Sequence, residues 1–140
     1  MTELEPVFKE LRRRMSLHED VFRRSVNATD ANVAGGRKVD RPEPETSYML
    51  LGAPNDKYPD GVAFGGVMLG KRYVSYHLMC VYMDTHLLEA MSPGLRKRMQ
   101  GKSCFNFTKV DEGLFDELSA ITDKGRELYA DQGWLATPPA

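Results

Sequence analysis

Ser75 and His77 are the first residues in this sequence whose types and spacing could do chemistry. They stand two apart in residues 73–79, YVSYHLM, a run typical of a β-strand. Alternate residues of a strand project to the same face, with attachment points about 7 Å apart. A serine hydrolase needs a serine–histidine hydrogen bond and an acid that orients the histidine, and this strand contains no acid. We therefore predict no catalytic centre here.

The same strand face predicts a small-ligand surface instead. We expect Tyr73, Ser75, His77 and Phe64 to border a shallow gap above Gly66, where no side chain fills the sheet. Half-apolar sheet faces are usually covered. The alternative is therefore that chain from the N-terminal half, or a second subunit, covers this face and that His77 is hydrogen-bonded within the packing.

A second candidate is an anion site in residues 92–110, a stretch that contains basic residues and no acid. Arg96, Arg98, Lys102 and Ser103 are the residues we expect to attract a phosphorylated ligand or a nucleic-acid backbone. Gly101 to Ser103 also match the end of a phosphate-binding loop, but position 96 is arginine where that motif has glycine. The alternative is a solvated surface whose charges are balanced by the acids that follow residue 110.

Histidine and cysteine spacings indicate no preformed metal site. The histidines show neither an i, i+4 pair nor a His-x-His pattern. Cys80 and Cys104 lack a Cys-x-x-Cys spacing, so we expect reduced packing residues rather than a zinc or redox motif. A disulfide between neighbouring strands is the alternative. A metal site built from carboxylates that are distant in the sequence is left open, and its ligands are unknown. The residues predict no cofactor.

Composition limits the class of protein. The chain has 140 residues, 41% of them hydrophobic, and a formal net charge of -1. We expect one domain over residues 1–135 with a short loose tail at 136–140. No apolar run approaches the roughly 20 residues of a membrane helix, and the N-terminus lacks the pattern of a secretory signal. The predicted location is the cytoplasm, without a membrane partner and without strong general attraction to nucleic acid.

Periodic apolar residues predict the elements that must position these side chains. Apolar residues at three- and four-residue spacing predict an N-terminal helix over residues 4–15. Residues 17–46 show neither this helical spacing nor the alternation of a strand, so we assign them no element. Strands are expected at 47–51, 62–69, 72–82 and 103–108. Short helices should follow Asp84 and Ser92, and Asp111 should cap a long final helix.

Gly70 and Lys71 predict a two-residue turn between the two central strands. The register would then place Tyr73 opposite Met68 and His77 opposite Phe64 on one face, with Tyr76 covering Gly65 on the other, apolar face. A tight hairpin favours an antiparallel sheet. We therefore predict an α+β fold of two layers, an antiparallel sheet packed against N- and C-terminal helices.

Three segments of the second half, namely residues 73–79, residues 92–107 (SPGLRKRMQGKSCFNF) and the helix start at Asp111, carry a family resemblance. They resemble the YdhG-like family of small bacterial domains of unknown function. The resemblance implies a frataxin-like fold, no established enzyme activity and, for some relatives, a link with intracellular iron handling. Iron favours oxygen ligands, and the first helix carries Glu3, Glu5 and Glu10 among basic residues.

Three hypotheses about function follow. The first is an uncharacterised, non-catalytic cytosolic binding domain whose outer sheet face takes a small ligand or a protein partner, including a second copy of the chain. The second is a frataxin-like iron carrier. The third is phosphate or nucleic-acid binding through the basic patch of residues 96–102. An enzyme is not excluded, because distant segments can assemble an active site.

Overall fold

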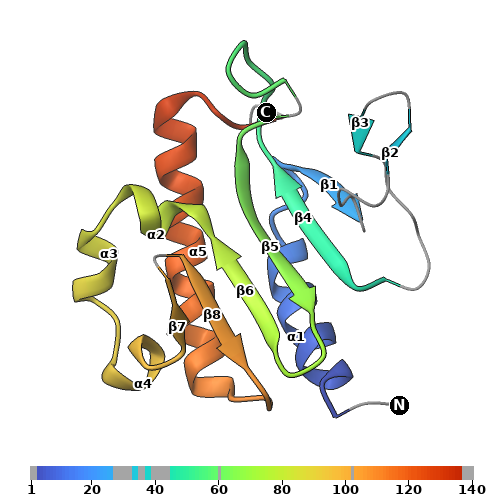
Figure 1. Cartoon of the computed structure of the whole chain (residues 1–140). Coiled ribbons are helices and arrows are strands. Elements are labelled where there is room, and N and C mark those ends of the chain that lie inside the picture. Colours follow the sequence, from blue (N-terminus) through green and yellow to red (C-terminus); the bar gives the residue numbers. More distant parts are fainter. Residues whose placement is uncertain are drawn as a thin grey trace.

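The computed structural model describes residues 3–26, 33–34, 37–38, 45–59, 61–101 and 103–136. Its elements, in chain order, are α1 (Glu5–Ser16), β1 (Arg23–Val26), β2 (Val33–Ala34), β3 (Arg37–Lys38), β4 (Ser47–Leu51), β5 (Ala63–Leu69), β6 (Val74–Leu78), α2 (Met79–Met83), α3 (His86–Glu89), α4 (Pro93–Arg96), β7 (Met99–Gln100), β8 (Cys104–Phe107) and α5 (Glu112–Gln132). An open six-stranded sheet has the order β1-β4-β5-β6-β8-β7, and β2 pairs with β3 separately. Every pairing is antiparallel, so the predicted α+β class is confirmed (Figure 1).

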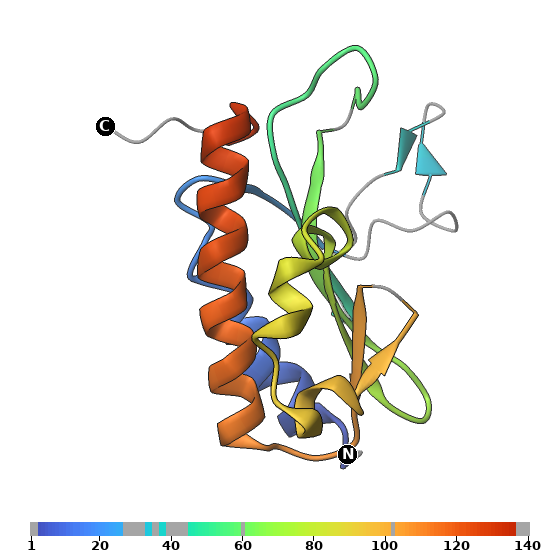
Figure 2. The same cartoon turned by 90° about the vertical axis from the view of Figure 1, so that its left-hand side faces the viewer.

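The helices α1 and α5 cover one face of the sheet (Figure 2). The apolar stripe of α1 is buried, as its spacing predicts, at Val7, Phe8, Leu11 and Met15. The α5 helix begins where Asp111 accepts a hydrogen bond from the amide of Leu114, and it ends at Gly133 in the left-handed conformation. Both helices are therefore determined by local signals, and their buried faces form the core together with the sheet.

Arg14 joins α1 to the beginning of α5. Its guanidinium donates to Glu10 on its own helix at 2.7 Å, to Glu112 at 2.7 Å and to Asp116 at 2.9 Å. The side chain is only 10% exposed. The acids Glu112 and Asp116 near the start of α5 thus pair with Arg14 of α1. Negative charge in the first turn of a helix is also stabilised by the helix dipole.

The turn between β5 and β6 consists of Lys71 and Arg72, one residue later than the predicted turn at Gly70 and Lys71. The amide of Gly70 donates to the carbonyl of Tyr73 at 3.0 Å, and Met68 lies opposite Ser75 rather than Tyr73. The pairing has moved by two residues, so the same side chains still share a face. The position opposite Gly65 is taken by Leu78 instead of Tyr76.

Phe64 lies in the core and not on the outer face where the regular register would put it. The pairing of β4 with β5 shifts between Leu50 and Leu51, which lie opposite Gly65 and Ala63, so that Phe64 is passed over. An extra residue of this kind bends the strand and redirects a side chain. The ring is fully buried and stacks on Phe22 at 4.1 Å between centroids. Phe64 is therefore a packing residue.

The strand β6 ends at Leu78, four residues before the predicted end, because the chain turns there into α2. The short helices α2, α3 and α4 connect β6 to β7 on the helical side of the sheet (Figure 2). Within the described residues, no helix has both the length and the apolar character that crossing a membrane requires.

Candidate functional site

The outer face of the sheet is the side away from α1 and α5. In the part of the chain that the structure describes, no helix lies on this face (Figures 1 and 2). Two cross-strand rows of side chains run over β4, β5, β6 and β8. One row is Ser47, Met68, Ser75 and Asn106; the other is Met49, Gly66, His77 and Cys104, followed by Gln100 on β7. Ser75 and His77 thus share the outer face as predicted.

His77 forms a cluster with two residues from the neighbouring strand region. Its Nδ1 lies 3.1 Å from Sγ of Cys104 and 3.3 Å from Oγ of Ser103. All three side chains are half-buried. Cys104 lies 27 positions from His77 in the sequence, and the two are brought together by the pairing of β6 with β8.

Burial determines the charge state of this cluster. It lowers the pKa of His77 below that of free histidine, and it raises the pKa of Cys104, with the hydroxyl of Ser103 opposing that rise. Both shifts favour the neutral forms. Nucleophilic cysteines instead use a thiolate stabilised by a protonated histidine. The pair therefore lacks the electrostatics of a cysteine nucleophile.

Ser75 belongs to a separate hydrogen-bond network. Its hydroxyl donates to Oδ1 of Asn106 at 2.8 Å, and Nδ2 of Asn106 donates to Gln100 at 3.1 Å. The hydroxyl of Ser75 is therefore directed to Asn106 on β8. Met68, 49% exposed, belongs to the same row, and Tyr73, 42% exposed, directly precedes β6.

The gap predicted above Gly66 is filled by Met49. A Cβ at Gly66 would lie 2.6 Å from Sδ of Met49 and 2.9 Å from the backbone carbonyl of Tyr48. Glycine is thus required where the thioether crosses β5. Met49 was not predicted as a site residue, because its place depends on how β4 pairs with β5, which no local pattern indicates.

Three of the expected anion-binding residues, Arg96, Arg98 and Ser103, belong to the described part of the chain. Arg96 ends α4 and Arg98 precedes β7, both with exposed side chains. Ser103 turns to His77. Lys102 lies outside the described residues, so its expected role in anion binding stays a prediction.

Cys80 is the second thiol and is a packing residue, as predicted. It is free and fully buried, and burial raises the pKa of its thiol to about 12. The ideal Cβ position of Gly125 on α5 lies 2.5 Å from its sulfur. Cys104 is also free but only half-buried, which distinguishes it from a core residue.

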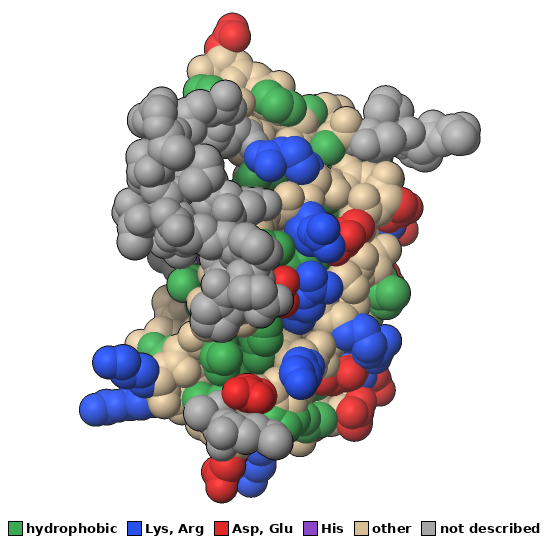
Figure 3. Space-filling view, turned by 90° about the vertical axis from the view of Figure 1, so that its right-hand side faces the viewer, with side chains coloured by type: hydrophobic (Ala, Val, Ile, Leu, Met, Phe, Trp, Pro, Cys, Tyr) green, Lys and Arg blue, Asp and Glu red, His purple; other side chains and the backbone are tan. Residues whose placement is uncertain are grey.

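One carboxylate of α1, that of Glu10, is held in ion pairs. Glu10 accepts from Arg13 and Arg14, and these hydrogen bonds lower its pKa to about 2. Arg12 makes two hydrogen bonds to Glu45 and lies 4.4 Å above the ring of Tyr48. On this side of the molecule basic and acidic side chains alternate (Figure 3), so it is a mixed surface and not an acidic field.

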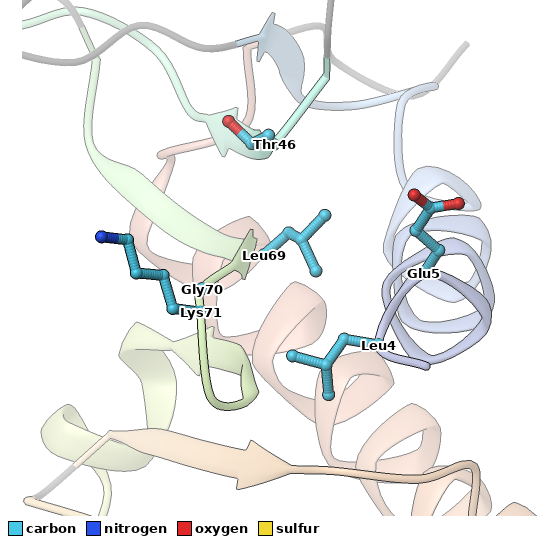
Figure 4. A pocket seen from close by; sticks show the side chains of 6 residues that line it. All are labelled: Leu4, Glu5, Thr46, Leu69, Gly70 and Lys71. Atoms are coloured by element: carbon cyan, nitrogen blue, oxygen red, sulfur yellow. The ribbon is translucent and has the colours of Figure 1, made fainter. Parts of the chain in front are cut away.

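A shallow hollow of about 450 Å³ lies between the start of α1 and the turn after β5. Leu4 and Leu69 point toward one another across it, while the amino group of Lys71 points away (Figure 4). Its lining is mostly apolar and brings no set of polar groups to one point. We assign it no chemistry.

Among the described residues, no three or more histidine, cysteine, aspartate or glutamate side chains group closely enough to hold a metal ion. Comparison of the chain with protein-family models, curated proteins and solved structures gives no match.

Proposed function

We propose that this chain is a non-catalytic cytosolic binding domain of the YdhG-like type, whose outer sheet face takes a small ligand. The observation that carries the proposal is the cluster of His77, Cys104 and Ser103. An imidazole, a thiol and a hydroxyl meet within 3.3 Å on a face that no described helix covers. Binding sites combine a few convergent polar groups with an apolar surround. Met68 lies in the row adjacent to His77, Tyr73 directly precedes the strand of His77, and both side chains are exposed.

A binding role accounts for these groups better than an enzymatic one. The shifted pKa values of His77 and Cys104 favour their neutral forms, and neutral groups donate and accept hydrogen bonds without an activated nucleophile. Ser75 is bonded to Asn106 and not to a base. Each group can thus contact a ligand through hydrogen bonds.

The iron-carrier hypothesis stays a prediction with less support. It requires free carboxylates on α1, and Glu10 is already held by two arginines. Its test is a ferrous iron titration of the wild type and of a variant with Glu3, Glu5 and Glu10 changed to glutamine. Saturable binding that the triple variant loses would favour iron.

Thermal unfolding in the presence of metals, nucleotides and common metabolites tests the proposed function, because a ligand that binds only the folded state raises the melting temperature. We expect at least one compound to do so, and Tyr73→Ala to reduce the shift. Tyr58→Ala is the matched control, since Tyr58 is 43% exposed on the loop before β5. If no compound raises the melting temperature and the protein does not self-associate, the proposal is wrong.

A further inference from the structure

Arg98 belongs to the outer face of the sheet and extends the row of Ser75 and Asn106. The backbone amide of Asn106 donates to the carbonyl of Arg98 at 2.8 Å, which places Arg98 beside it at the edge of the sheet. Gln100, two residues further along, lies on the outer face through its pairing with Cys104. Side chains alternate between faces, so Arg98 shares the face of Gln100 and adds a positive charge to an otherwise uncharged row.

The charge of Arg98 is not balanced within the described part of the chain. Arg98 makes no ion pair there, and neither do Lys71 and Arg72 in the exposed turn between β5 and β6. On the helical side, by contrast, Arg14 and Arg126 are held by carboxylates. The unpaired cations thus lie at the edge and at one end of the outer face, where they would attract an anion.

Neutral hydrogen-bonding groups lie beside Arg98 on the same face. The hydroxyl of Ser75 donates to Oδ1 of Asn106 at 2.8 Å, and Nδ2 of Asn106 donates to Oε1 of Gln100 at 3.1 Å. A side-chain amide nitrogen carries two hydrogens, so one N–H of Asn106 and both of Gln100 lie outside this network. They can donate to the carbonyl oxygens and ring nitrogens of a planar heterocycle.

Tyr73 supplies an aromatic surface on this face. It stands two residues before Ser75, so the alternation of the strand gives both residues the same face, and its side chain is 42% exposed. By the usual spacings within and between strands, the backbones of Tyr73 and Arg98 lie about 12 Å apart. Both side chains are long, so the ring can stack on a base while the guanidinium reaches its phosphate.

We propose that this face binds a nucleotide unit, with the base stacked on Tyr73 and the phosphate held by Arg98. The free N–H groups of Asn106 and Gln100 donate to the edge of the base. A guanidinium forms two parallel hydrogen bonds to phosphate, and open sheets with exposed aromatic side chains bind bases by stacking. The inference rests on the proposed function, because it names the class of ligand for the same outer face.

Isothermal titration of the full chain with the common ribonucleoside 5′-monophosphates, the matching nucleosides and inorganic phosphate tests the proposal. We expect at least one monophosphate to bind more tightly than its nucleoside and than phosphate alone, because only the nucleotide uses both ends of the site. Its affinity should fall as the salt concentration rises. A trinucleotide identifies the source of the unit: tighter binding indicates a single strand, and equal binding indicates a free nucleotide. Both results support the site.

Variants separate the two ends of the site. Tyr73→Ala should weaken binding by about fivefold or more, the usual loss when a stacking ring is removed, and Tyr73→Phe should bind as the wild type does. Arg98→Gln should weaken binding by about tenfold or more, as expected when a hydrogen bond to a charged group is lost. Lys124→Gln is the charge-matched control, because Lys124 is exposed on α5, on the other side of the sheet. Circular dichroism establishes that each variant is folded.

Nuclear magnetic resonance gives a test without any variant. The side-chain amide signals of Asn106 and Gln100 should shift during the nucleotide titration, and unchanged signals would refute the contact with the base. Absence of saturable nucleotide binding, equal affinity for nucleotide and nucleoside, or wild-type affinity in Arg98→Gln or Tyr73→Ala would each overturn the inference.

The two proposals fail separately. If no nucleotide binds while another compound raises the melting temperature in a manner that depends on Tyr73, this inference is wrong and the proposed function stands.

Discussion

Replacement of Phe64 by alanine should lower the free energy of unfolding by about 3 to 5 kcal/mol, the usual cost of removing a large buried aromatic ring. The ring is fully buried, stacks on Phe22 at 4.1 Å and meets Tyr129 edge-on at 5.1 Å. Aromatic pairs add about 0.5 to 1.5 kcal/mol beyond their area, so we expect the upper half of that range. A loss of this size is a large fraction of the about 5 to 15 kcal/mol that stabilises a typical domain.

The same substitution tests the irregularity in the pairing of β4 with β5 that turns Phe64 into the core. In a regular strand Phe64 would share the outer face with Met68, and its removal would then cost little. Met68→Ala is the matched control, because Met68 is 49% exposed and surface substitutions usually change stability by within about 0.5 kcal/mol.

Urea unfolding followed by circular dichroism measures both variants. The midpoint should fall sharply for Phe64→Ala with the slope of the transition unchanged. If the two variants differ by less than about 1 kcal/mol, the ordinary span of surface effects, then the bulge does not place Phe64 in the core and the packing described here is refuted.

Three further predictions concern stability. Tyr76→Phe should lower the free energy of unfolding, measured in urea, by about 1 to 3 kcal/mol, because the buried hydroxyl hydrogen-bonds Thr122 at 2.6 Å. An unchanged free energy of unfolding would mean that this hydrogen bond does not contribute to stability. Gly133→Ala should lower the free energy of unfolding by about 1 kcal/mol, because the φ of 76° at this position is strained for a residue with a side chain. The melting temperature measures the loss, and an unchanged value would contradict the left-handed cap. The folded-state pKa of Glu10, about 2, lies below its ordinary 4.5, so its contribution to stability is present above pH 4.5 and is lost as the pH falls toward 2. Glu10→Gln should flatten the acid limb of the stability curve, and an identical acid limb would show that the pairing of Glu10 with Arg13 and Arg14 is not coupled to folding.

Local sequence determined α1, α5 and the two faces of β6. The stripe of α1 and the Asp111 cap of α5 are signals within a few residues, and both elements lie where those signals place them. The alternation of β6 correctly put Tyr76 in the core and His77 on the outer face, even though the register was wrong by two residues. Alternation has a period of two, so a shift of two leaves every face unchanged.

Tertiary structure alone decided which residues meet on those faces. The bulge that buries Phe64 arises from pairing with β4 and is stabilised by rings on distant segments, Phe22 and Tyr129. His77 was a predicted site residue but Cys104 was not, because Cys104 joins His77 through the pairing of β6 with β8, 27 positions away in the sequence. Such pairing depends on the burial and closure of the whole sheet, and no periodicity within a single strand records which strand will lie beside it.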